Sequence, residues 1–411
     1  MEIYRLVTVH DANGSIAKKN TSKEAVDPSP SSFEGKPRFS SWLSPIQNSL
    51  DSLMRSTGTY PAEVVEAHLA FMRDVVVPRL KPPAAADRVH YIGTHSNSCY
   101  DASLAFETHK SPKVRFSAQP IVYPSAPQGG DPFGQKEMRE IMEGIASACG
   151  ADRTWLDIFL DSIFFTVEEE AEMIRKWAVD AAPGAAGRLL RQSGFVSFDF
   201  EPEMEEDGRA ATLMKAYLFP QLKALAKGQN TLDTTDYVVS RLAEGDKEML
   251  AAWELVKKFL STDGRENINL DFLAIDCLAP HKEPRFKVYI TTPYTSLAAV
   301  REVFTLGGLL HQSSADFLTH VWPQLMDMED ILQAEMEELE TPLRDPDSHW
   351  EGVSFTFSMV PGKAVPLIKM YMPMWQLPRD EAQILEAYQR ILQSQGILGD
   401  YDLKAAVQGA L

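Results

Sequence analysis

The sequence is poor in cysteine, in positive charge and in long hydrophobic runs, and each shortage excludes a class of protein. Only three cysteines occur among 411 residues. They lack metal-ligand spacing, so we expect buried thiols in a reducing compartment, the cytoplasm. The net charge of −18 argues against nucleic acid or a membrane surface as a partner. No apolar run approaches the roughly 20 residues that span a bilayer. The first residues show no basic stretch followed by an apolar one, so no secretory signal is predicted.

Against this acidic background, one short stretch places positive charge at alternate positions. In PRFKVYITTP, residues 284–293, Arg285, Lys287 and Tyr289 alternate with apolar residues. The aromatic and β-branched content and the period of two predict a strand whose basic and phenolic side chains share one face. In so acidic a protein, an anion-binding cluster of this kind must be local and sheltered.

The same pattern occurs in three further segments. Each has a basic residue on a short apolar strand, an aromatic residue one or two places later, and a preceding stretch that also alternates. Turn-forming residues such as Pro361–Gly362 separate the two members of a pair. The four basic segments are 113–120, 213–220, 284–293 and 367–373, and the stretches before them are 98–107, 195–202, 268–277 and 352–359. The sequence therefore predicts four antiparallel hairpins.

The intervals between these hairpins have apolar residues at spacings of three and four, which predicts helices. The predicted helices are 63–80, 136–149, 168–181, 247–260, 313–333 and 379–393. Hairpins that alternate with helices predict an α+β fold, an antiparallel β-barrel of repeated αββα units with helices outside. The basic and phenolic face then points inward. Residues 1–40 are predicted to be a flexible N-terminal arm, because 11–36 are polar, and 41–411 a single barrel domain.

Several motifs in this order resemble the fungal indole prenyltransferases of the dimethylallyltryptophan synthase type. They are R-x-K-x-Y at 285–289, K-x-Y at 215–217, Arg115 after the first strand pair, DPFG at 131–134 and TLGGLL at 305–310. The resemblance runs from about Trp42 to about Leu392. It implies an enzyme of secondary metabolism, a prenyltransferase in which an aromatic, indole-like substrate meets an allylic diphosphate such as dimethylallyl diphosphate. It also implies that no metal and no other cofactor is needed.

The chemistry of that reaction suits the residues in question. Without a metal, the departing diphosphate must be stabilised by fixed cations, and the allylic cation left behind by aromatic ring faces. The resemblance also implies an acidic residue that accepts the indole N–H, and Asp101 stands where the family usually has glutamate. The predicted diphosphate-binding residues are Arg115, Lys215, Arg285, Lys287 and Lys369, and the predicted catalytic residues are Asp101, Tyr217, Tyr289 and Tyr371.

The family ordinarily has a fifth helix–hairpin unit, and no strand pair is visible after 379–393. We therefore expect a barrel that lacks its last strand pair. Three explanations are open: the barrel closes in a different way, a partner completes it, or the protein is a truncated or repurposed relative. An alternative interpretation is a relative that does not prenylate, either a terpene-cyclising enzyme or a non-catalytic barrel that binds a prenyl diphosphate or small molecule. A homodimer is left open.

Two acidic pairs could suggest a magnesium–diphosphate site. Asp327 and Asp330 fall in a stretch that we interpret as a long, solvated acidic helix. Asp233 and Asp236 resemble a helix cap. Neither pair has the adjacent aspartates of magnesium-dependent prenyl synthases, so we interpret neither as a metal site.

Overall fold

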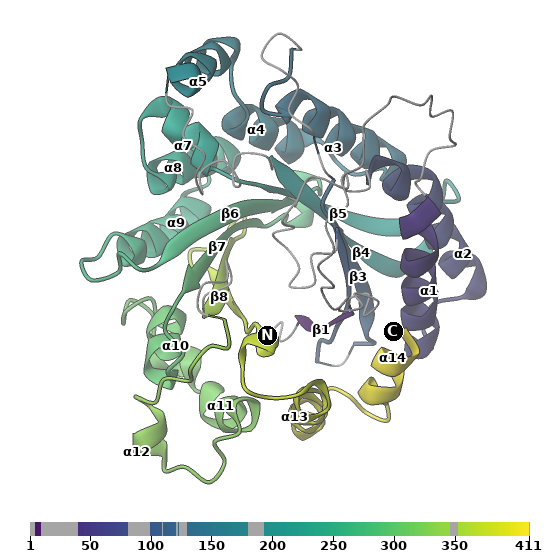
Figure 1. The fold of residues 1–411 in the computed structure, drawn as a ribbon, viewed down its shortest axis with the longest axis vertical. Coiled ribbons are helices and arrows are strands. Elements are labelled where there is room, and N and C mark those ends of the chain that lie inside the picture. Colours follow the sequence, from purple (N-terminus) through teal and green to yellow (C-terminus); the bar gives the residue numbers. More distant parts are fainter. Residues whose placement is uncertain are drawn as a thin grey trace, which may run out of the picture.

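The strands of the protein form one curled antiparallel sheet, surrounded by helices (Figure 1). The computed structural model describes residues 5–9, 40–80, 99–108, 110–120, 122, 130–179, 193–345 and 352–410. Within them each strand pairs with the next along the chain, in the order β1 to β9. The strands are β1 Arg5–Val9, β2 Tyr100–Ala105, β3 Lys113–Ala118, β4 Gly194–Met204, β5 Ala210–Leu218, β6 Asn269–Asp276, β7 Phe286–Thr292, β8 Val353–Met359 and β9 Leu367–Tyr371.

The four predicted hairpins are confirmed, as β2–β3, β4–β5, β6–β7 and β8–β9. The sequence did not predict β1, which pairs with the other edge of β2 and places Val7 opposite Leu104. This strand falls inside the segment expected to be a flexible arm. The extent of the arm and the domain boundary at residue 41 stay predictions.

Helices precede, separate and follow the hairpins, as predicted, and they form a ring outside the sheet (Figure 1). They are α1 Ser40–Thr57, α2 Ala62–Phe71, α3 Gln135–Cys149, α4 Thr154–Ile163, α5 Val167–Val179, α7 Gln221–Lys227, α8 Thr231–Ala243, α9 Lys247–Leu260, α10 Leu297–Phe304, α11 Leu318–Met326, α12 Gln333–Met336, α13 Glu381–Ser394 and α14 Leu403–Ala410. None of those described is both long and apolar enough to cross a membrane.

One predicted helix is wrong. The segment 313–333 is not continuous, because α11 ends at Met326 and Asp327 adopts a left-handed conformation with φ of 59°. Aspartate tolerates this conformation better than most residues. The acidic stretch that follows is mostly turns, with helix only in the short α12, so it is not the long acidic helix that we expected.

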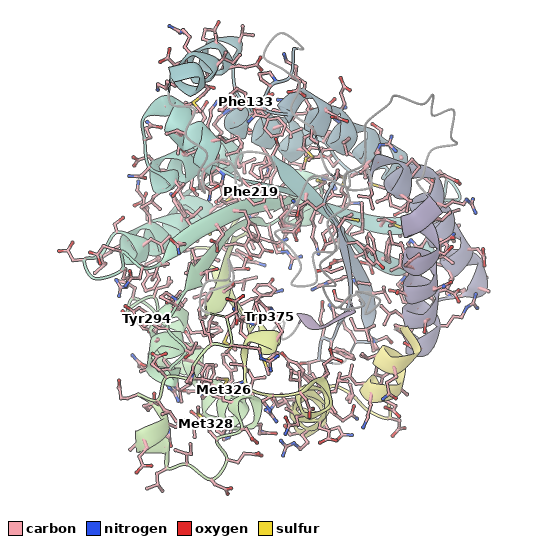
Figure 2. The ribbon with its side chains drawn as sticks, viewed as in Figure 1. Phe133, Phe219, Tyr294, Met326, Met328 and Trp375 are labelled. Atoms are coloured by element: carbon pink, nitrogen blue, oxygen red, sulfur yellow. The ribbon has the colours of Figure 1, made fainter. Side chains whose placement is uncertain are left out.

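The period of two separates a hydrophobic core from a polar inner face. Phe286, Val288 and Ile290 of β7 are fully buried in the core beneath the helices. The residues between them, Lys287 and Tyr289, lie on the opposite face, which we call the inner face of the sheet. Figure 2 shows the side chains that fill the layer between sheet and helices.

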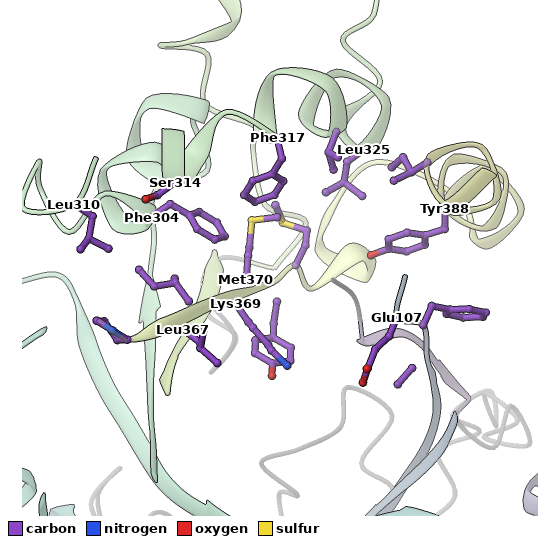
Figure 3. Close-up of a pocket in the computed structure, with 18 of the residues that line it drawn as sticks. Glu107, Phe304, Leu310, Ser314, Phe317, Leu325, Leu367, Lys369, Met370 and Tyr388 are labelled. Carbon is purple, nitrogen blue, oxygen red and sulfur yellow. The ribbon is translucent and has the colours of Figure 1, made fainter. Parts of the chain in front are cut away.

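The curled sheet does not close in the part of the chain that the structure describes. There β9 pairs only with β8, and β1 pairs only with β2. A pocket of about 230 Å³ lies at this seam, between β9 and the end of β2. Figure 3 shows an apolar wall that includes Phe304, Phe317 and Tyr388, while Lys369 and Glu107 project to the other side of the pocket. The helices α13 and α14 run past the seam toward α1 (Figure 1).

Candidate active site

Two buried carboxylates organise the predicted cations on the inner face. The first is Asp199 on β4, whose side chain is 4% exposed. Its Oδ1 lies 3.1 Å from Nε of Arg115 on β3 and accepts a hydrogen bond from Nζ of Lys215 on β5. One carboxylate therefore joins cations from the two strands that flank its own.

The second carboxylate is Asp276 at the end of β6, whose side chain is 1% exposed. Its Oδ2 lies 2.6 Å from Nε of Arg285, and its Oδ1 accepts a hydrogen bond from Nζ of Lys287 on β7. Lys215 is also the register partner of Asp276. The two groups therefore form one continuous cluster across β3 to β7, which brings together four of the five predicted diphosphate-binding residues.

The fifth, Lys369, lies apart from this cluster. It is opposite Thr356 of β8, which in turn is opposite Tyr289 of β7, so Lys369 is level with the tyrosine rather than with Lys287. Together with Arg115 it lines the pocket at the seam (Figure 3). A ligand that reached Lys369 would extend from the cluster toward β9.

Burial and charge compete in this cluster. Burial alone would raise the pKa of Asp199, but the charges of Arg115 and Lys215 outweigh it and hold that pKa well below its ordinary value. The same balance keeps the pKa of Asp276 low. Burial lowers the pKa of Lys215 and, in part, of Lys287, and the nearby carboxylates oppose that shift. The carboxylates thus help to keep buried lysines charged.

The predicted tyrosines form a row beside the cluster. The ring centroids of Tyr217 and Tyr289 are 5.8 Å apart, and those of Tyr289 and Tyr371 are 5.9 Å apart. Phe195 stacks on Tyr217 at 4.1 Å, and Phe272 stacks on Tyr289 at 4.3 Å. Phe219, which is labelled in Figure 2, joins Phe195, Tyr217 and Phe272 in a hydrophobic cluster on the inner face, separate from the main core, and Tyr289 packs against this cluster.

Sequence reasoning missed the phenylalanines and both organising carboxylates. Each of Phe195, Asp199, Phe272 and Asp276 lies in an alternating stretch that was correctly predicted as a strand. The available signal was the even spacing of these residues along each strand. Phe195 and Asp199 share a face in FVSFDF, as do Phe272 and Asp276 in FLAID. An acid and an aromatic ring on one face of an otherwise apolar strand therefore predict a site on the inner face, as a basic residue does.

Asp101 lies on β2, and its side chain is buried. It is opposite Ser117 of β3, whose hydroxyl bonds Ser197 of β4 at 3.3 Å. Ser197 is the register partner of Lys215. Asp101 is thus three strands away from Lys215 along one line of the sheet, and its role as acceptor of the indole N–H stays a prediction.

The acidic pairs have other partners. Asp236 of α8 accepts a hydrogen bond from Trp253 Nε1 at 2.7 Å and lies 2.9 Å from Lys257 Nζ. The N-cap of α8 is Asn230, so Asp233 lies in the first turn rather than at the cap. Across the described ranges, no group of three or more His, Cys, Asp or Glu side chains is placed to hold a metal ion.

In this fold, an αββα sheet curls around sheltered cations and aromatic ring faces. Sheltered cations can stabilise a departing diphosphate and ring faces can stabilise an allylic cation, so these features define the class of aromatic prenyltransferases. The sequence profile of the tryptophan dimethylallyltransferase family matches residues 40–404. The chain belongs to this family, and aromatic prenyl transfer is its activity.

Curated relatives agree with this assignment. The indole prenyltransferase tdiB of Emericella nidulans is 30% identical over 377 residues, which cover 88% of this chain and 86% of the relative. The indole diterpene prenyltransferase terF of Tolypocladium album is 28% identical over 377 residues, which cover 89% and 83%.

Solved structures share the fold. The NotF prenyltransferase matches with a TM-score of 0.68 at 20% identity, over 88% of this chain and 84% of that one. AnaPT from Neosartorya fischeri matches with a TM-score of 0.65 at 20% identity, over 90% and 83%.

Proposed function

We propose that the protein transfers a dimethylallyl group from dimethylallyl diphosphate to an indole-like small molecule, without a metal ion. The observation that carries the proposal is the cation cluster around Asp199 and Asp276, which lies beside a row of tyrosines on the inner face. The relative tdiB is an indole prenyltransferase, and PriB has been solved with L-tryptophan and dimethylallyl thiolodiphosphate. Both support the choice of substrates.

In this proposal the bond between C1 of the prenyl group and the diphosphate oxygen breaks, and its electron pair leaves with the diphosphate. That anion is stabilised by Arg115, Lys215, Arg285 and Lys287. From the seam, Lys369 contacts the diphosphate or another part of the prenyl donor. Preorganised donors in a sheltered site commonly supply the largest catalytic contribution. The rings of Tyr217, Tyr289 and Tyr371 face the allylic cation, each contributing about 0.5–2 kcal/mol. Asp101 accepts the N–H of the indole.

Metal independence and a cytoplasmic location belong to the same proposal. Fixed cations already provide the positive charge that magnesium supplies to a diphosphate elsewhere. Cys99, Cys149 and Cys277 are free thiols in the structure, which fits a reducing compartment.

The test compares variants that remove one positive charge each. Lys287→Gln and Arg285→Gln remove donors of the cluster, whereas Lys282→Gln removes an exposed lysine from the turn between β6 and β7. We expect the first two to lose on the order of 10²–10³ in turnover of dimethylallyl diphosphate with an indole panel. Lys282→Gln should behave like the parent. Product is measured by mass spectrometry, with EDTA present.

Two results would contradict the proposal. Near-parental turnover in both cluster variants would show that the diphosphate binds elsewhere. Loss of all activity in EDTA, restored specifically by Mg²⁺, would show that a metal site exists among acids that we discounted.

A further inference from the structure

The start of β6 carries a half-buried carboxylate that the cation cluster does not use. The pairing of β6 with β7 shifts between Leu270 and Phe272, so Asp271 is the extra residue of a β-bulge. Gln221 at the start of α7 donates from Nε2 to the backbone carbonyls of Leu270 at 2.9 Å and Asp271 at 2.7 Å. These two hydrogen bonds fix the bulge.

The bulge directs the Asp271 side chain to the inner face. Its Oδ2 accepts a hydrogen bond of 2.6 Å from the Thr291 hydroxyl, which lies 3.0 Å from the hydroxyl of Ser354. Thr291 is two residues after Tyr289 on the same face of β7, and Phe272 stacks on that tyrosine. The carboxylate therefore lies at the edge of the aromatic cluster and at the end of a chain of hydroxyls.

The surroundings of Asp271 favour a carboxylate that can gain and lose a proton near neutrality. Burial raises its pKa to about 7, against the opposing effect of the Thr291 hydrogen bond. The charged inner-face groups of the neighbouring strands, Lys215 and Lys287, are bound to Asp199 and Asp276. Asp276 is about 16 Å further along β6 at 3.3 Å per residue.

Among the described residues, burial and the Thr291 hydrogen bond shift the pKa of Asp271, and no charged group adds to that shift. On α7, Lys223 is bound to Glu169 at 2.5 Å, and Lys227 lies over the ring of Tyr237. The helices α4 and α8 contact β6 from the outer side of the sheet. Their titratable residues are Asp157 and Asp161 on α4, and Asp233, Asp236, Tyr237 and Arg241 on α8.

We propose that Asp271 is the catalytic base of the transfer, the group that takes the proton which the aromatic acceptor loses. The proposal rests on the proposed function. When C1 of the prenyl cation bonds to the ring, the acceptor becomes a cation that still carries a hydrogen at the attacked atom. Asp271 takes that hydrogen as a proton, and the electron pair of the broken bond restores the aromatic system. The proton then leaves through the hydroxyls of Thr291 and Ser354.

A structural role for Asp271 would need only the hydrogen bond from Thr291. Asparagine can still accept that bond through its side-chain carbonyl, but it cannot take a proton. The Asp271→Asn variant therefore separates the two roles. Asp263→Asn, in the exposed loop before β6, makes the same chemical change away from the inner face and serves as the control.

The experiment measures kcat for an indole acceptor, the Kd of dimethylallyl thiolodiphosphate, and the pH dependence of both. A general base typically contributes about 10²–10⁴ in rate, so Asp271→Asn should lose at least about 10²-fold in kcat with its donor Kd unchanged. The parent should lose activity as the pH falls through about 7, and the variant should lack that limb. With a ring-deuterated indole, the isotope effect should be larger in the variant, because proton loss becomes rate-limiting.

A second readout uses stability. The pKa of Asp271 in the folded protein, about 7, is above the ordinary unfolded value of about 3.9, so the stability of the fold falls as the pH rises from about 4 through about 7 and then levels off. The Tm of Asp271→Asn relative to the parent should therefore increase with pH over that range. A folded variant whose kcat stays within about threefold of the parent and keeps the acidic limb would overturn the proposal. A parent that prenylates no aromatic acceptor would instead overturn the proposed function.

Discussion

At the scale of single residues, the pKa values of buried aspartates shift in opposite directions in this protein because their neighbours differ. Asp199 and Asp276 each have two cationic partners and stay ionised despite deep burial. Asp271 has a hydroxyl as its partner, and burial dominates. Removing one member of a buried ion pair commonly costs 3–5 kcal/mol, because the other charge is left without a counter-ion. The carboxylates of the cluster are therefore as important as its cations.

The first prediction at this scale concerns Asp199→Asn. Without the carboxylate, burial and the charge of Arg115 lower the pKa of Lys215 further, so the lysine loses its proton as the pH rises. We expect the KM for dimethylallyl diphosphate to rise with pH in the variant, by about tenfold once Lys215 is neutral, and to rise less in the parent, because a hydrogen bond to a charged group is lost.

The control is Asp207→Asn, which removes an exposed carboxylate from the turn between β4 and β5. Circular dichroism confirms that each variant is folded. If the pH profile of Asp199→Asn runs parallel to that of the parent, Lys215 does not depend on Asp199 for its charge.

At the scale of elements, the sequence predicted the strands themselves better than the register in which they pair. Alternation is local, so all eight strands of the four hairpins could be recognised. The pairing of Arg115 with Asp199 depends on the register of β3 against β4, which joins residues far apart in the chain. For the same reason the organising carboxylates were missed. The break at Asp327 depends on one left-handed residue that the apolar spacing of 313–333 does not reveal.

The prediction at this scale concerns Asp101 on β2. The register of β2 against β3 sets the position of its side chain on the inner face. Asp101→Asn keeps the shape but replaces an anion with a neutral amide, and a charge-assisted hydrogen bond is roughly twice as strong as a neutral one. We expect kcat/KM for the indole acceptor to fall more than about tenfold. Asp101→Glu should match or exceed the parent, because it restores the side chain usual in the family.

The donor Kd is the internal control for both variants, since the cation cluster lies on β3 to β7. Turnover of the aromatic substrate by Asp101→Asn at the parental rate would leave Asp101 with only a structural role on β2.

At the scale of the whole molecule, an acidic protein surrounds a cationic interior. The net charge of −18 gave no hint of an anion site, yet the inner face gathers four basic residues from three hairpins around two carboxylates, with Lys369 apart from them on the fourth hairpin. The first and the last of the described helices, α1 and α14, meet beside the seam (Figure 1). Ser49 and Ser52 of α1 donate hydrogen bonds to the carbonyls of Ala410 at 3.0 Å and Gly409 at 2.7 Å in α14. These contacts hold the ring of helices together where the sheet is open.

The last prediction concerns a chain that begins at residue 40. It keeps α1 and every strand of the four hairpins, but it loses β1 and leaves one edge of β2 unpaired. We expect this chain to unfold cooperatively with a Tm lower by only a few degrees, because β1 contributes one strand pair at an edge and every core residue that the structure describes is kept. Donor Kd should be unchanged, since β1 is two strands away from β3. The KM for the acceptor should rise, because the freed edge loosens the strand that carries Asp101.

Thermal unfolding followed by circular dichroism, together with the donor Kd and the acceptor KM, checks the expectation. A chain that aggregates, or that no longer binds dimethylallyl thiolodiphosphate, would show that the first 39 residues are an integral part of the barrel rather than an arm.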